Sequence, residues 1–201
     1  MKKSAPSKAE TALLEPFVGL PLERIHVPTT KAQFVSASAD IRASGIVGFD
    51  TESKPTFVTG TASEGPHVVQ FALHSRAYIF QLHQADCRRF LVELLESEDV
   101  LKVGFGLKSD RGQIQTKLGV KLQAVLDLNN VFREDGYGGS MGVRAAVGIV
   151  LKQRFHKSKK TTTSNWARPQ LTAKQLLYAT NDAFAALKVL EGLKLSHEEL
   201  R

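Results

Sequence analysis

The sequence has a single cysteine, Cys87, among its 201 residues. One cysteine cannot form an intramolecular disulfide and cannot build a cysteine-based zinc site. No stretch approaches the roughly 20 apolar residues of a membrane span. The apolar run Ala12-Leu13-Leu14 is also too short for the hydrophobic region of a signal peptide. These absences predict a cytoplasmic protein that does not enter a membrane.

Acidic side chains are missing from residues 136–181, although the segment is rich in basic ones. The basic residues there are Arg144, Lys152, Arg154, Lys157, Lys159, Lys160, Arg168 and Lys174. The whole chain has a formal net charge of +7. Such a segment favours a polyanionic partner such as nucleic acid, and the alternative is an ordinary solvated face.

Length and composition predict one domain. A hydrophobic content of 42% in 201 residues is enough for a core. Pro6, Pro16 and Pro21 interrupt any long helix near the start. We therefore expect residues 1–22 to form a flexible leader and residues 23–201 to form the domain.

Apolar runs of strand length alternate with helical patterns along the domain. The expected strands are 46–52, 67–73, 77–82, 100–105 and 125–128. One expected helix follows Thr29 or Thr30, and others follow Asp86, run over 107–118 and follow Ser140 through about Gln153. A final helix follows Thr172. Three early strands followed by alternating helix and strand predict an α/β fold, with a mixed β-sheet flanked by helices on both faces.

An apolar run from Ile46 ends in two carboxylates, Asp50 and Glu52, that are separated by one residue. Side chains alternate along a strand, so these two project from the same side and lie close enough to share a hard divalent cation. The alternative is a strand end with two solvated acids. Further carboxylates must therefore reach the same place if the pair is functional.

Two later carboxylates are candidates for this convergence. Asp110 follows a buried-looking strand at the start of a helix, and Asp182 lies four residues after Tyr178, on the same helical face. Carboxylates without histidine or cysteine partners suit Mg²⁺ or Mn²⁺ rather than zinc. A pair of such ions can hold the attacking and leaving oxygens of a phosphodiester. Tyr178 is placed to orient the attacking water, and the alternative interpretation is that it is an ordinary half-buried tyrosine.

Three motifs carry a family resemblance: Phe49-Asp50-Thr51-Glu52, the strand followed by Asp110, and Tyr178 four residues before Asp182. In order and spacing they resemble the exonuclease motifs of the DEDD superfamily in its tyrosine subgroup, DEDDy. The run from Ser164 to Leu171-Thr172 looks like RNase D and the Werner-syndrome type of exonuclease domain. The similarity covers about residues 25–193. It implies a ribonuclease H-like fold and metal-dependent 3′ to 5′ release of nucleoside 5′-monophosphates.

The resemblance also implies roles for the motif residues. Asp50, Glu52 and Asp182 would hold the metal that activates water, and Asp50 would also bind a second Mg²⁺ or Mn²⁺ ion. Asp110 would support that second ion through water. Tyr178 would position the nucleophile.

Substrate contacts are expected beside the motifs and in the basic segment. Thr51 and Phe105 are candidates for the terminal nucleotide of a DNA or RNA strand. Candidates for the phosphate backbone are Lys157, Lys159, Lys160 and Arg168. Trp166 would either stack on a base or buttress the last helix.

One departure from the family pattern and one rival function stay open. Ser53-Lys54-Pro55 follows Glu52 where the Werner type usually has tryptophan and prolines, so the substrate entrance is expected to differ. The rival function is a catalytically silent nucleic-acid-binding module with the same fold. Retention of all five motif residues argues against it, because a buried acidic cluster is costly without metal. The residues do not choose between DNA and RNA.

Overall fold

The computed structural model describes residues 3–56, 63–139 and 141–195, and its centre is a six-stranded sheet. In spatial order the strands are β2 (Ile25–His26), β5 (Ala77–Gln81), β4 (Val68–Ala72), β3 (Ile46–Glu52), β6 (Leu101–Gly104) and β7 (Val125–Asp127). β3 pairs antiparallel with β4 on one side and parallel with β6 on the other. This arrangement confirms the predicted mixed sheet.

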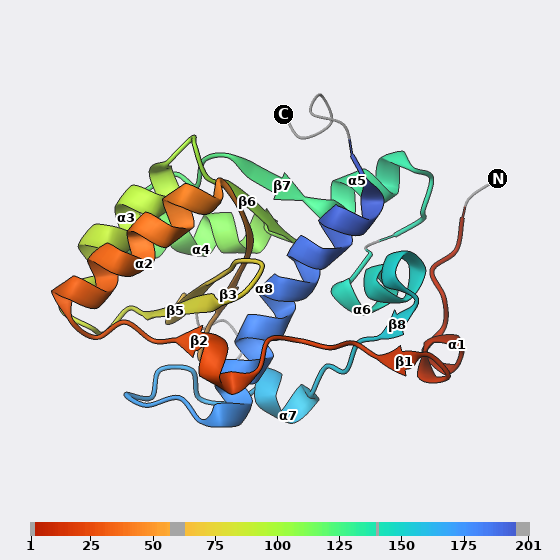
Figure 1. Cartoon of the computed structure of the whole chain (residues 1–201), viewed down its shortest axis with the longest axis horizontal. Coiled ribbons are helices and arrows are strands. Elements are labelled where there is room, and N and C mark those ends of the chain that lie inside the picture. The colour runs from red at the N-terminus through yellow and green to blue at the C-terminus, as the bar shows by residue number, and fades with distance from the viewer. Residues whose placement is uncertain (1–2, 57–62, 140, 196–201) are drawn as a thin grey trace.

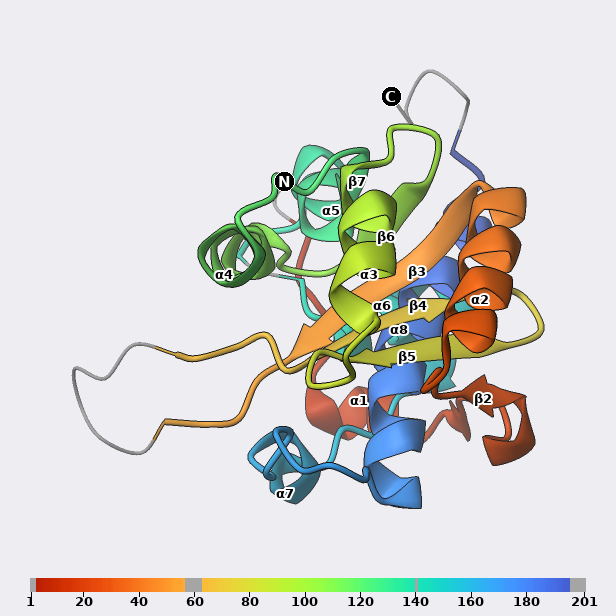
Figure 2. The ribbon, with the colours of Figure 1, turned by 90° about the vertical axis from the view of Figure 1, so that its left-hand side faces the viewer.

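Helices cover both faces of the sheet, as predicted. Figure 2 shows α2 (Lys31–Ser44) and α3 (Cys87–Glu96) in front of the strands and α8 (Ala173–Leu193) behind them. α4 (Lys108–Leu118) contributes Ile114 and Leu118 to the same core as α2 and α3. In Figure 1, α8 runs diagonally across the molecule. None of the helices in the described ranges is long and apolar enough to cross a membrane.

Local capping explains how the chain enters β3. Thr30 accepts a hydrogen bond from the backbone N–H of Gln33, whose side chain reaches back to the backbone of Thr30. This capping box starts α2. Gly45 ends the helix with φ of 66°, a value that glycine adopts at little steric cost. β3 begins at the next residue, so the helix stop and the strand start are set together.

The segment after β7 differs from the prediction in two ways. α5 (Leu128–Glu134), which was not predicted, starts without a loop because the Asp127 carboxylate accepts the backbone N–H of Asn129 at 3.0 Å. The helix predicted from Ser140 to Gln153 is shorter than expected, and Ser140 lies outside the described residues. It consists of α6 (Val143–Ala146) and one π-helical segment (Val147–Leu151). Lys152 adopts a left-handed conformation with φ of 54° and ends it.

Residues 3–22, which we expected to form a flexible leader, contact the domain. The segment contains α1 (Lys8–Ala12), β1 (Glu15–Pro16) and a 3-10 turn that begins at its end (Leu22–Arg24). β1 pairs in parallel with β8 (Gln153–Arg154) in a separate two-stranded sheet. The mobility of this N-terminal segment in solution and the domain boundary at residue 22 stay predictions.

Candidate active site

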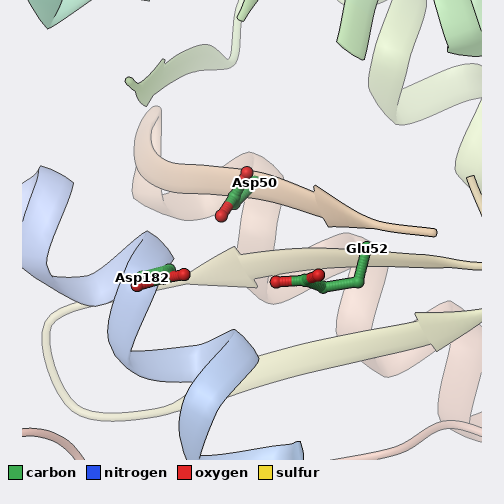
Figure 3. Close-up of side chains that lie close together, drawn as sticks. All are labelled: Asp50, Glu52 and Asp182. Atoms are coloured by element: carbon green, nitrogen blue, oxygen red, sulfur yellow. The ribbon is translucent and has the colours of Figure 1, made fainter. Parts of the chain in front are cut away.

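Three of the predicted carboxylates converge at the carboxyl end of β3. Asp50, Glu52 and Asp182 each place an oxygen within 4.8 Å of the oxygens of the other two. Figure 3 shows the three side chains pointing toward a common space between β3 and α8. Glu52 and Asp182 are buried, and Asp50 is partly exposed. We call Asp50, Glu52 and Asp182 the carboxylate cluster.

A glycine allows α8 to come close enough to complete the cluster. Alternation along β3 places Gly48, Asp50 and Glu52 on the face that α8 covers. A Cβ atom at Gly48 would lie 1.9 Å from the backbone oxygen of Ala183, which real atoms do not tolerate. Because Asp182 precedes Ala183, the close approach of the two backbones at Gly48 brings the Asp182 carboxylate beside the strand.

The cluster is electrostatically unfavourable by itself. Burial, together with the charges of Asp182 and Asp110, raises the pKa of Asp50 well above its usual range. Burial and the charge of Asp50 raise the pKa of Glu52 to about 10. Burial also raises the pKa of Asp182, although Lys157 opposes the shift, and Asp182 Oδ1 has no hydrogen-bond partner. An all-oxygen set with unsatisfied charge fits a hard divalent cation.

Lys157 lies at the cluster itself. Its Nζ is 2.8 Å from Asp182 Oδ2, and its side chain is 39% exposed. Burial would lower the pKa of the Lys157 ammonium, but the charge of Asp182 more than compensates, so that pKa lies above its ordinary value. From the sequence, Lys157 was predicted to contact the phosphate backbone of the substrate, and this ion pair was not predicted.

Asp110 lies beside the cluster and not within it. Thr51 points to the opposite side of β3 from Asp50 and Glu52. Its hydroxyl donates a hydrogen bond to Asp110 Oδ1, so Asp110 is held near the strand end from α4. Burial raises the pKa of the Asp110 carboxyl. The structure therefore brings three predicted metal ligands together and leaves the fourth, Asp110, outside this group.

Tyr178 precedes Asp182 by one turn of α8 and is nearly buried, at 8% exposure. Its hydroxyl lies 2.7 Å from the hydroxyl of Thr162 in α7 (Lys159–Thr162), and its ring centroid is 5.9 Å from that of Trp166. Burial and the charge of Asp182 raise the pKa of the phenol above its ordinary value. Tyr178 is consequently a neutral phenol at physiological pH, available for hydrogen bonding.

A cavity of about 220 Å³ opens beside the cluster and is lined by Asp50, Asp182, Lys157, Phe105 and Asn129. The predicted contact Phe105 thus faces the site. Asn129 was not predicted, and its buried Oδ1 has no hydrogen-bond partner. Its position after β7 was a usable signal, because β3, β6 and β7 are parallel and their carboxyl ends meet at one edge of the sheet.

The remaining predicted substrate contacts divide into exposed and buried residues. Lys159, Lys160 and Arg168 are exposed. Trp166 is only 1% exposed, and its Nε1 donates to the Thr162 carbonyl at 3.2 Å. Of the two alternatives for Trp166, burial favours buttressing of α8 and leaves no ring face for base stacking in this conformation.

Gln70 is a buried polar residue that sequence reasoning missed. It pairs with Asp50 across β3 and β4, has no exposed surface, and neither side-chain amide atom has a hydrogen-bond partner. Burying an unsatisfied polar group costs about 1–3 kcal/mol. We expect Gln70→Leu to raise the free energy of unfolding of the metal-free protein by about 1 kcal/mol, measured by urea denaturation in EDTA. Gln70→Glu should lower it instead, because it adds a like charge beside Asp50.

Comparison with known proteins identifies the family. Residues 25–198 match the family described as 3'-5' exonuclease. The chain is 28% identical over 183 residues to the Bifunctional 3'-5' exonuclease/ATP-dependent helicase WRN of Mus musculus, covering 89% of this chain and 13% of that protein. It is 27% identical over 202 residues to the Exonuclease mut-7 homolog of Aedes aegypti, covering 88% of this chain and 27% of that protein. The chain therefore spans only a small part of these relatives.

Solved structures share the fold. The Aedes aegypti Nibbler EXO domain superposes with a TM-score of 0.73 at 24% identity, covering 91% of both chains. Escherichia coli RNase D gives a TM-score of 0.73 at 18% identity, covering 88% of this chain and 45% of that one. These likenesses confirm the ribonuclease H-like arrangement of a mixed sheet between helices. With the family match over most of its length, the chain belongs to the DEDD-type 3'-5' exonuclease domain family.

Proposed function

We propose that this chain is a metal-dependent 3′ to 5′ exonuclease of the DEDDy subgroup that releases nucleoside 5′-monophosphates. The observation that carries the proposal is the convergence of Asp50, Glu52 and Asp182 within 4.8 Å in a member of this family. The raised carboxyl pKa values support it, since such a site requires a cation or protons to be stable. A silent binding module has no chemical use for this arrangement.

The carboxylate cluster would hold Mg²⁺ or Mn²⁺. When bound, such ions make water a stronger nucleophile and stabilise charge on the phosphate oxygens. Asp110, held by Thr51 beside the cluster, would support a second ion through water. The unsatisfied Oδ1 of Asp182 supports this assignment, because a buried anionic oxygen without a partner is costly.

The protein residues around the cluster would orient the substrate end and the water. Tyr178 stays protonated at physiological pH, so it would position the nucleophilic water by hydrogen bonding and would not remove its proton. The cavity between Phe105 and Lys157 would receive nucleotide at the 3′ end, beside Asp50. Thr51, which is held by Asp110, is close to the same strand end.

The substrate would be single-stranded or 3′-ended DNA or RNA. RNase D of Trypanosoma brucei, solved in complex with RNA U12, shares the fold with a TM-score of 0.74 at 18% identity.

The functional test uses a 5′-labelled single strand, once as DNA and once as RNA, with Mg²⁺, Mn²⁺ or EDTA. We expect a metal-dependent ladder that shortens from the 3′ end. Salt-sensitive binding of either strand without cleavage would replace this proposal with the silent module.

Lys159 and Lys160 are expected to contribute to substrate binding more than to chemistry. Both are exposed on α7, close in sequence to Lys157. We expect the double reversal Lys159→Glu with Lys160→Glu to raise KM by about tenfold or more and to flatten the salt dependence of binding. Steady-state kinetics at two salt concentrations measure both effects. An unchanged KM with a collapsed kcat would instead assign these lysines to the reacting centre.

The matched control for this experiment reverses the same number of charges elsewhere. Lys31 and Lys121 are exposed lysines outside residues 136–181. The double variant Lys31→Glu with Lys121→Glu should leave KM within about twofold, because only a long-range change in net charge remains. A comparable KM increase in both double variants would show that net charge alone is responsible.

A further inference from the structure

Lys157 forms an ion pair with one of the carboxylates that would hold a cation. Its Nζ lies 2.8 Å from Asp182 Oδ2, and the Asp182 side chain is only 3% exposed. Within residues 3–56, 63–139 and 141–195, Lys157 is the one basic side chain that forms an ion pair with the carboxylate cluster. The protein therefore supplies one positive charge of its own to a site with three carboxylates.

The backbone around Lys157 is anchored, whereas its ammonium has room to move. Phe155 is 4% exposed and its ring centroid lies 5.5 Å from that of Phe17, so the chain is fixed two residues earlier. Ser158 caps α7 one residue later by accepting the N–H of Thr161. The Lys157 side chain itself is 39% exposed and also lines the cavity beside Asp50. The Lys157 side chain therefore borders open space as well as Asp182.

A divalent cation and an ammonium that share the Asp182 carboxylate repel each other. Two positive charges about 4 Å apart repel strongly where protein excludes water. Asp182 Oδ1 is available to a cation, but Oδ2 is already paired. For both carboxylate oxygens of Asp182 to bind a cation, Lys157 must move away from Oδ2.

We propose that Lys157 is an exchangeable counter-cation of the metal site. In the metal-free protein it pairs with Asp182, and on metal binding it is released into the cavity, where its ammonium is available to a substrate phosphate. Lys157 would thereby lower the apparent metal affinity and couple metal binding to the assembly of the substrate site. This inference rests on the proposed metal site.

The first test measures metal affinity without reference to activity. Mn²⁺ binding is followed by electron paramagnetic resonance of free Mn²⁺ for the wild type, Lys157→Met, Lys157→Arg and the control Lys174→Met. Lys174 is an exposed lysine on α8, the same helix as Asp182. We expect Lys157→Met to bind Mn²⁺ at least about tenfold more tightly than the wild type, a difference of roughly 1.4 kcal/mol. Lys157→Arg and Lys174→Met should stay close to the wild type.

The second test uses the wild type, so it does not depend on the folding of a variant. Lysine amines are acetylated at low reagent excess in EDTA or in Mg²⁺, and the modified peptides are quantified by mass spectrometry. An ion pair with a buried carboxylate protects an amine, and release exposes it. We expect acetylation of Lys157, relative to Lys174, to increase several-fold when Mg²⁺ is added.

Failure of the exchange and failure of the metal site give different results. If the wild type binds Mn²⁺ and Asp50→Asn abolishes this binding, the metal site stands. Equal or weaker Mn²⁺ affinity in Lys157→Met, or unchanged protection of Lys157 in Mg²⁺, would then overturn the exchange alone. If the wild type shows no Mn²⁺ binding that depends on Asp50, the metal site is wrong and the exchange is wrong with it.

Discussion

Asp50→Asn is expected to lower kcat by about a thousandfold or more while the protein stays folded. Asp50 is the residue on which the proposed site depends most, because it belongs to the carboxylate cluster and also lines the adjacent cavity. The substitution keeps the side-chain shape but removes the charge that a divalent cation requires. Single-turnover cleavage of a 5′-labelled strand in Mg²⁺ measures the loss.

The same substitution is expected to stabilise the metal-free protein. Burial and the neighbouring charges of Asp182 and Asp110 raise the pKa of Asp50, so its ionised form is unfavourable in the folded state. The neutral amide avoids this cost. We expect Asp50→Asn to raise the free energy of unfolding in EDTA by about 1 kcal/mol or more at neutral pH. A variant that gains stability and loses activity separates a functional carboxylate from a structural one.

Asp99→Asn is the matched control, since it makes the same chemical change at an exposed position outside the cluster. It should change neither kcat nor stability measurably. Retention of more than about a tenth of the wild-type kcat by Asp50→Asn would contradict the proposed role of Asp50. If Asp50→Asn lowered both kcat and the free energy of unfolding, the loss of activity would instead come from disruption of the fold.

Local sequence rules predicted the elements that present the site. The predicted cap at Thr29 or Thr30, the capping box at Thr172 and the stop at Gly45 place α2, α8 and β3 where the structure has them, with Thr30 as the cap of α2. Alternation along β3 correctly placed Asp50 and Glu52 on one face. These features depend on residues within a few positions of each other, so periodicity and capping are sufficient to find them.

Features that depend on long-range packing were not predicted. The approach of α8 to β3 at Gly48 joins residues about 135 positions apart, and nothing near Gly48 in the sequence marks it. The pairing of Lys157 with Asp182 depends on β8 and on the segment that pairs with β8. Both are fixed by tertiary contacts and not by propensity.

Lys102 illustrates the same limit in the core. A lysine within a strand is normally expected to reach solvent, yet Lys102 is fully buried in β6. Its ammonium donates to the carbonyl oxygens of Ser97 and Gln123 at 2.7 Å and 3.0 Å, and burial lowers its pKa to about 8. These acceptors belong to the loops that precede the parallel strands β6 and β7. The sequence contains no periodic signal for such an arrangement.

Removing divalent metal is expected to make stability depend strongly on pH. The pKa of Glu52 is raised to about 10 in the folded protein, and the pKa of Asp50 is also raised, whereas in the unfolded chain both carboxyls lose their protons near their ordinary values. At pH values between the ordinary and the raised pKa values, the folded state binds more protons than the unfolded state. Stability in EDTA should therefore fall as pH rises, with a slope near 1.4 kcal/mol per pH unit for each carboxyl that keeps its proton on folding.

Divalent metal should reverse this trend, because a cation takes the place of the protons. Its binding requires ionised carboxylates and stabilises the folded state by mass action. We expect the rise in Tm on adding Mn²⁺ to be small near pH 5.5 and several degrees near pH 8.5. Thermal unfolding at both pH values, with EDTA or Mn²⁺, tests the wild type and Glu52→Gln. The variant should show a weaker pH dependence in EDTA because it lacks one titrating carboxyl. A wild-type Tm in EDTA that is equal or higher near pH 8.5 would show that the cluster is neutralised by the protein itself, and Lys157 would then be sufficient as its counter-charge.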